Sequence, residues 1–101
     1  DVNVKNLTRE IIYKKCNFKY RELKNWTCEE CKTYLGDKSN KKYLHTHHID
    51  HQKSNNSFFN FKALCIECHS KKPHHDILKN SYDYKNFIRK KKLKAQLFKY
   101  N

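Results

Sequence analysis

The spacing of hydrophobic positions predicts a helix at each end of the chain. Within residues 1–26, the apolar positions that recur at helical spacing are Leu7, Ile11 and Phe18. A capping side chain for the start of this helix is available at Asn6 or Thr8. From Asp83 to the end of the chain, one apolar stripe is formed by Tyr84, Ile88, Ala95 and Phe98. We therefore expect two terminal helices, each with one face toward a common core.

Between these helices the pattern is that of a β-β-α unit. Residues 43–49 and 61–64 are short runs that suit strands, and residues 50–60 form a polar loop between them. A further helix is expected to begin near Cys65 and to run toward Pro73 or beyond. The sequence thus predicts a small α+β fold in a single domain, residues 1–101. Its parts are an N-terminal helical segment (1–26), a core (27–79) and a basic C-terminal helix (80–101).

The apolar content of the chain is low for a folded domain. Hydrophobic residues make up 37% of the 101 residues, so the core that they can form is thin. Aromatic residues are better represented and gather in blocks such as Phe58, Phe59 and Phe61. We therefore expect an aromatic core that depends on an additional source of stability.

The charge balance is strongly positive and indicates a polyanionic partner. Lysine and arginine number 23 against 10 acidic residues, a formal net charge of +13. Such a charge opposes compaction unless a polyanion is present, and nucleic acid is the expected partner. A membrane surface is the competing interpretation, although no apolar run is long enough to span a bilayer.

Four of the five cysteines form two C-x-x-C pairs, Cys28 with Cys31 and Cys65 with Cys68. This spacing lets both sulfur atoms of each pair reach one ion, and four thiolates complete a tetrahedral site with no open position. We predict a structural Zn²⁺ site; a rubredoxin-like iron site is the alternative ion, which the basic charge does not favour. Cys16 is expected to be a small core residue.

Between the two cysteine pairs lies His47-His48-Ile49-Asp50, followed by Asn60 and then by His69, directly after Cys68. With the flanking cysteines, this order and spacing resembles the HNH, or ββα-metal, endonuclease family over roughly residues 28–75. The resemblance implies a ββα-metal core held together by a four-cysteine zinc site and flanked by terminal helices.

The resemblance also implies a role for each residue of the motif. His48 corresponds to the general base that takes a proton from the attacking water. His47 and His69 correspond to ligands of a catalytic divalent ion, Mg²⁺ or Mn²⁺. Asn60 corresponds to the motif asparagine, whose amide would tie the 50–59 loop to the strand and so hold His48 in place.

Some features depart from the family pattern. Many relatives carry aspartate where this chain has His47, so the site is softer and also admits Ni²⁺ or Zn²⁺. A third ligand at His74 or His75 is a weaker expectation. Strand alternation would point His47 and His48 to opposite faces, unless the strand ends or bulges there.

Several further side chains are candidates for contact with nucleic acid. They are Lys53, Lys71, Lys72, Arg89, Lys90, Lys91 and Lys92. Three aromatic residues are expected in the core before any role in base stacking: Trp26, Tyr82 and Tyr84. Three histidines are expected to be ordinary surface or hydrogen-bonded residues: His45, His51 and His75.

The leading functional hypothesis is an endonuclease that acts on DNA and leaves 5′-phosphate and 3′-hydroxyl ends, as the resemblance implies. The alternative is a non-catalytic zinc module that only binds nucleic acid, and a RING-like protein-interaction module ranks last. The chain could act as a homodimer or as a module of a larger restriction, homing or phage protein. The N-terminus lacks an apolar signal-like segment, so an intracellular location is expected, cytoplasmic in a bacterial or phage context.

Overall fold

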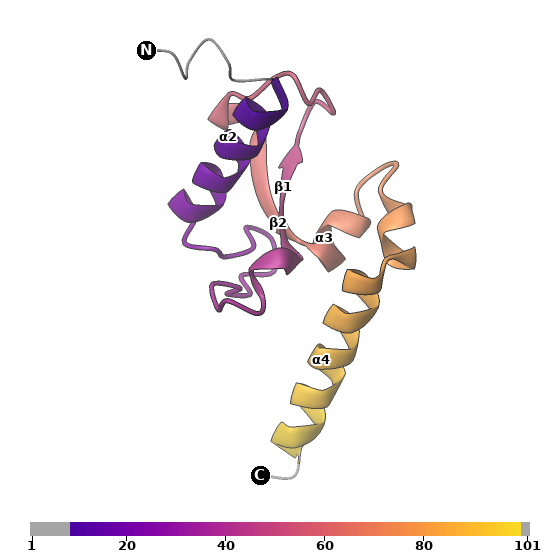
Figure 1. Cartoon of the computed structure of the whole chain (residues 1–101). Coiled ribbons are helices and arrows are strands. Elements are labelled where there is room, and N and C mark those ends of the chain that lie inside the picture. Colours follow the sequence, from indigo (N-terminus) through magenta and orange to yellow (C-terminus); the bar gives the residue numbers. More distant parts are fainter. Residues whose placement is uncertain (1–8, 100–101) are drawn as a thin grey trace.

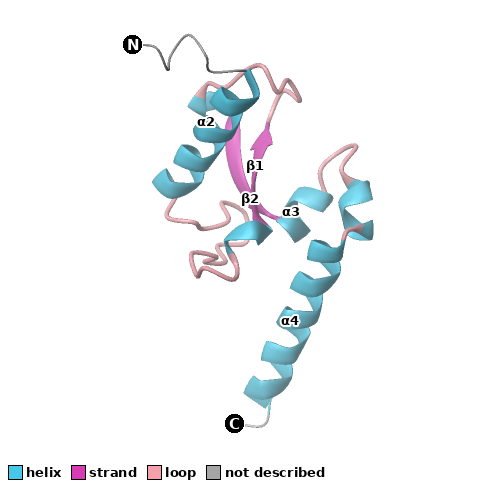
Figure 2. Ribbon diagram, viewed as in Figure 1, coloured by secondary structure: helices cyan, strands magenta, loops and turns pink. Residues whose placement is uncertain are grey.

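The structure is a computed structural model in which the backbone of residues 9–99 is described (Figure 1). Within that part of the chain the fold is α+β, as predicted, with a two-stranded sheet and three α-helices (Figure 2). The elements are α2 (Arg9–Leu23), η1 (Lys41–Tyr43), β1 (Leu44–His48), η2 (Phe58–Asn60), β2 (Phe61–Cys65), α3 (Ile66–Ser70), η3 (Asp76–Asn80) and α4 (Tyr82–Lys99), where η denotes a 3-10 helix. The predicted positions Asn6, Leu7 and Thr8 lie outside the described residues, as does the side chain of Phe98.

The two strands confirm the predicted hairpin and fix its register. β1 and β2 pair antiparallel, with Leu44 opposite Cys65 at one end and His48 opposite Phe61 at the other. The apolar side chain of Leu44 is buried because the helices cover it. The register therefore places a cysteine at one end of the sheet and a histidine at the other.

Helix α2 packs on the sheet through a different face from the one predicted. Ile11 and Phe18 are 40% and 45% exposed, so the predicted stripe faces largely outward. The inward side instead carries Asn17 and Tyr20, which are both buried. The Tyr20 hydroxyl donates to the Glu29 carboxylate at 2.6 Å, and such a partner allows a tyrosine to be buried.

The core is small and largely aromatic, as the composition predicts. Its buried hydrophobic residues other than cysteine are Tyr20, Trp26, Leu35, Tyr43, Leu44, Phe61, Ala63, Leu64, Ile66 and Phe87. Cys16 packs at the edge of this cluster, in agreement with its prediction as a core residue. Trp26 is buried as expected, whereas Tyr82 is 74% exposed, so its expected place in the core is wrong.

Helix α4 contacts the core through its first half only. Phe87, which the predicted stripe omitted, is buried with its ring centroid 5.4 Å from that of Tyr43. Tyr84 and Ile88 pack beside it, but Ala95 is exposed because the second half of the helix extends away from the body (Figure 1). No helix in the described part of the chain is both long and apolar enough to cross a membrane.

Helix α3 is shorter than predicted and ends at Ser70. Pro73 lacks an N–H group and disfavours helical backbone in the residue before it, so the helix cannot continue. The chain then turns at His74, whose φ of 67° is left-handed, and enters η3 after His75. This turn brings His75 back against the end of α3.

The packing of α4 gives a first prediction. Phe87→Ala should lower the free energy of unfolding by about 3–5 kcal/mol, because it removes a buried aromatic ring and leaves a cavity. Urea denaturation of the zinc-loaded protein measures this change. Leu97→Ala on the same helix is the control, since that side chain is 68% exposed. Equal denaturation midpoints for the two variants would show that α4 does not stabilise the body.

Candidate metal centre and histidine pocket

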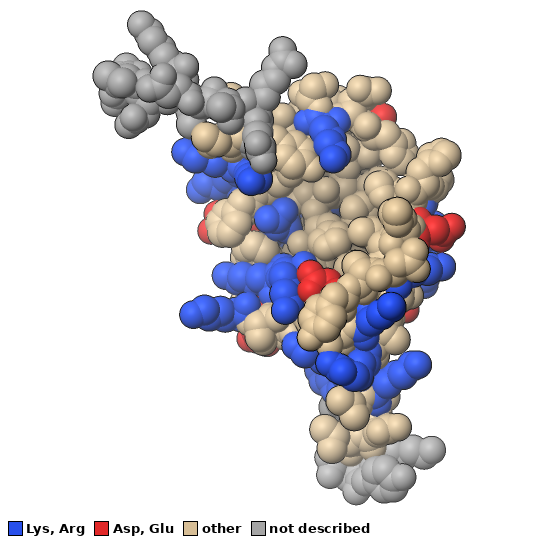
Figure 3. Space-filling model, turned by 45° about the vertical axis from the view of Figure 1, so that its right-hand side comes forward, with Lys and Arg blue, Asp and Glu red and all other residues tan. Residues whose placement is uncertain are grey.

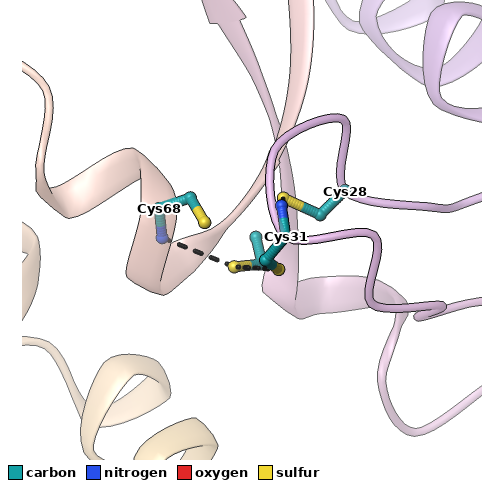
Figure 4. A group of neighbouring side chains, drawn as sticks. Cys28, Cys31 and Cys68 are labelled. Atoms are coloured by element: carbon teal, nitrogen blue, oxygen red, sulfur yellow. Dashed lines mark hydrogen bonds between the residues drawn. The ribbon is translucent and has the colours of Figure 1, made fainter.

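The four predicted cysteines lie together and could hold a metal ion such as zinc. One sulfur atom from each of Cys28, Cys31, Cys65 and Cys68 lies within 4.8 Å of the other three. Figure 4 shows three of these side chains, Cys28, Cys31 and Cys68, close together. The Cys31 and Cys65 sulfur atoms are 3.7 Å apart. Four ligands about 2.3 Å from a tetrahedral Zn²⁺ would be about 3.8 Å from one another, so this spacing fits the ion.

In each cysteine pair, a backbone N–H group donates a hydrogen bond to a sulfur atom. The Cys31 N–H donates to the Cys28 sulfur at 3.5 Å, and the Cys68 N–H donates to the Cys65 sulfur at 3.4 Å. Cys65 is thereby the N-cap of α3, where the helix dipole favours a thiolate. Each pair thus forms a turn whose N–H groups stabilise negative sulfur.

The sequence between the first pair attaches this turn to the sheet. The Glu29 N–H donates to the Ala63 carbonyl at 2.8 Å, and the Glu29 carboxylate accepts from the Ala63 N–H at 2.6 Å. The Glu30 carboxylate pairs with Lys62 and Lys72. Lys32, with a φ of 65°, lets the chain leave the turn. The turn that carries Cys28 and Cys31 is therefore fixed against β2, the strand that leads to Cys65 and Cys68.

The raised pKa values of two of the thiols, Cys65 and Cys68, indicate that a cation would favour their ionised form. Burial raises the pKa of Cys68 to about 11, and burial together with the neighbouring sulfur atoms also raises the pKa of Cys65. Burial acts in the same direction at Cys31, but hydrogen bonds, first from Thr33, outweigh it and lower the pKa to about 7. Thiolates at Cys65 and Cys68 are thus unfavourable alone, and a dication would supply the missing charge.

A second cluster of possible metal ligands is made of histidines. One ring nitrogen from each of His47, His69 and His75 lies within 4.8 Å of the other two. His47 comes from β1, His69 from α3, and His75 from the turn before η3. The predicted ligands His47 and His69 are therefore brought together, and the weaker expectation of His75 as a third member agrees with the geometry, whereas His74 is outside the cluster.

Two further histidines surround this cluster, although they were expected to be ordinary residues. The His45 Nδ1 atom lies 3.0 Å from the His69 Nδ1 atom. The His51 ring stacks on that of His75 with centroids 5.7 Å apart. His45 precedes His47 by two residues in a strand, a spacing that puts both on one face and could have revealed it.

His47 and His48 line the same pocket despite strand alternation. The pocket has a volume of about 120 Å³, and its lining also includes Tyr13 and Lys53. β1 ends at His48, so the strand termination required for this arrangement is present. The His48 ring stacks on Tyr13, with centroids 5.3 Å apart, and packs edge-on against Phe61.

Asn60 holds the loop that follows His48. Its side-chain oxygen accepts from the Asp50 N–H at 3.0 Å, and its amide donates to the Asp50 carboxylate at 2.9 Å and to the Asn55 carbonyl at 3.0 Å. The backbone carbonyl of Asn60 accepts from the Ile49 N–H at 2.8 Å. The residue thus ties both sides of the loop to the start of β2, as its position in the motif suggested.

The pKa values of the three clustered histidines are lowered, which favours the neutral imidazole. Burial lowers the pKa of His47 to about 4, with a further contribution from His75. Burial, then the nearby His45, lowers the pKa of His69 to about 3. Burial also lowers the pKa of His75. A neutral imidazole has the free lone pair that a metal ion needs.

The predicted nucleic-acid-binding side chains differ in their availability. Lys53 lines the histidine pocket. Lys72 pairs with Glu30, and Lys91 pairs with Glu67, so both already have carboxylate partners. Four others are exposed and have no carboxylate partner among the residues whose side chains the structure describes: Lys71, Arg89, Lys90 and Lys92. Lysine and arginine side chains dominate the lower part of the face in Figure 3.

Comparison of the chain with protein-family models, with curated proteins and with solved structures found no match. The residues and their geometry therefore carry the functional argument.

The cysteine cluster gives a second prediction. The purified protein should carry one tightly held zinc ion per chain, and Cys65→Ser should release it and unfold much of the domain, because the binding energy of the ion is folding energy. Elemental analysis and thermal melting measure the two effects. Cys16→Ser, outside the cluster, is the control. A Cys65→Ser protein that keeps its zinc and its melting temperature would rule out this site.

Proposed function

We propose that the chain is a metal-dependent endonuclease of the HNH, or ββα-metal, type that hydrolyses DNA phosphodiester bonds. One observation carries the proposal: His48 and the three-histidine cluster line a single pocket at the junction of β1 and α3. The four-cysteine cluster at the start of α3 and the positive charge of the chain, +13, also support it. Both features suit a small domain that binds a polyanion.

His48 would act as the general base. Its ring is held by Tyr13 on one side and Phe61 on another, so its orientation is restricted. The Nε2 atom lies 3.4 Å from the Asn56 side-chain oxygen. In the tautomer with a proton on Nε2, this bond leaves the lone pair on Nδ1 to take a proton from water as the water attacks phosphorus. Asn60 would keep the loop that carries Asn56 in place.

His47, His69 and His75 would hold the divalent ion. The pKa of each is lowered, which favours the neutral imidazole, and the three converge within the distance that one ion can span. The cluster itself contains no carboxylate, so the donor set suits Mn²⁺, Ni²⁺ or Zn²⁺ as well as Mg²⁺. When bound, the ion would neutralise the charge that develops on the scissile phosphate and its leaving oxygen.

The rival function is a zinc module that binds nucleic acid without cutting it. Such a module needs the cysteine cluster and the basic surface but has no use for convergent, buried histidines. The buried positions of His47, His48 and His69 favour the enzyme, because burying several polar imidazoles together costs free energy that a catalytic role would justify.

The histidine cluster gives a third prediction. His69→Ala and His75→Ala should each weaken Mn²⁺ binding at least tenfold, since each removes one ligand, while the zinc content stays at one per chain. Isothermal titration calorimetry and elemental analysis measure these quantities. His74→Asn is the matched control, because it alters the neighbouring histidine and asparagine tolerates its left-handed backbone. Loss of the zinc from His69→Ala would assign that residue to the cysteine site instead.

The general base gives a fourth prediction. His48→Ala should lower the rate of supercoiled-plasmid cleavage with Mg²⁺ or Mn²⁺ by at least ~10²-fold, while affinity for DNA is retained. His48→Gln preserves most of the side-chain volume and tests whether lost packing against Tyr13 is the cause. Both variants should lose cleavage and keep a cooperative melt, with His74→Asn as the active control. Cleavage at the wild-type rate by either variant would exclude His48 as the base.

A further inference from the structure

A larger groove borders the histidine pocket. Its volume is about 380 Å³, and Tyr13, Thr46 and His69 line both hollows. Beyond this shared wall the groove is lined by the cationic side chains Arg21, Lys41 and Lys42. These three residues define what we call the basic groove. It joins α2 to η1 and lies next to the proposed reaction site.

The cations of the basic groove are not neutralised. Among residues 11–97, whose side chains the structure describes, no carboxylate lies within ion-pair distance of Arg21, Lys41 or Lys42. In contrast, Lys72 and Lys91, near the cysteine cluster, pair with glutamates. Positive potential is therefore concentrated beside the histidine pocket and partly cancelled beside the cysteines.

Arg21 is fixed in place for an anion. Its Nη1 donates to the Thr46 hydroxyl at 3.0 Å, and that hydroxyl donates to the Asn17 carbonyl at 3.0 Å. The guanidinium lies over the Trp26 ring, 5.5 Å from its centroid. Its Nε atom is buried and has no hydrogen-bond partner in the described part of the chain. Burial of the guanidinium also lowers the pKa of Arg21.

Lys41 and Lys42 are exposed yet supported by aromatic rings. The Lys41 ammonium lies 4.7 Å from the centroid of Trp26, and the Lys42 ammonium lies 5.3 Å from that of Tyr43. Both rings belong to the core, and both lysines lie in η1, which leads directly into β1. These contacts restrict two flexible side chains to the rim of the groove.

We propose that the basic groove binds the sugar-phosphate backbone of the DNA strand on one side of the phosphate that occupies the histidine pocket. This inference rests on the proposed nuclease function and extends it, because it adds Arg21, Lys41 and Lys42 to the substrate-binding surface. These side chains contact phosphates and not base edges, so binding here is independent of sequence. The groove thereby sets the position of the strand relative to His48.

The test compares two variants of equal charge. Lys41→Gln/Lys42→Gln removes two cations from the groove, whereas Lys19→Gln/Lys79→Gln removes two lysines that are already paired with carboxylates. Affinity for a labelled duplex is measured by fluorescence anisotropy at several salt concentrations, with zinc-loaded protein and no added divalent metal. The groove variant should flatten the slope of log affinity against log salt by up to about 1.8, about 0.9 for each lost phosphate contact, and the control should leave it unchanged.

Cleavage assays separate this inference from the nuclease proposal. The groove variant should raise KM and leave kcat near the wild-type value, because the chemistry at His48 is intact once DNA is saturating. Equal salt slopes in the two double variants would overturn the groove, even if the wild-type protein cuts DNA. A flattened slope without any wild-type cleavage would retain the groove as a nucleic-acid site and reject the nuclease.

Discussion

Four sulfur atoms from two distant parts of the chain must share one small volume, and the rest of the structure is arranged around that requirement. Cys28 and Cys31 reach the site from a loop, and Cys65 and Cys68 reach it from the junction of β2 and α3. A bound metal would connect these parts where the thin aromatic core cannot. Because His69 follows Cys68 directly, the same constraint sets the position of His69 within the histidine cluster.

The opposite end of the hairpin is set by hydrogen bonds. Asn60 bonds to Asp50 and Asn55 and thereby closes the loop immediately after His48. β1 can end at His48 because this loop takes over its support. His48 and the preceding His47 then line one pocket, which a continuing strand would not permit.

The charged side chains are arranged differently around the cysteine cluster and around the histidine pocket. Near the cysteines, Glu30 and Glu67 pair with lysines, so the local potential is moderated. Near the histidines, burial lowers the pKa of the clustered imidazoles, and the adjacent cations Arg21 and Lys41 have no carboxylate partner among the described side chains. An anionic substrate would therefore be drawn toward the histidine pocket and away from the cysteine cluster.

The sequence alone determined the features that depend on the spacing of residues close together in the chain. Two C-x-x-C pairs predicted a four-sulfur site, two short runs predicted the two strands, and the motif grouped His47 with His69 in one candidate site. Side chains that meet only through turns could not be found in this way. His75 joins the cluster because the chain reverses at Pro73 and at the left-handed His74. The basic groove exists because α2 turns its Asn17 and Tyr20 face to the sheet, and hydrophobic periodicity had predicted a different face. Periodicity records which residues share one element, whereas the packing of separate elements decides which of them meet.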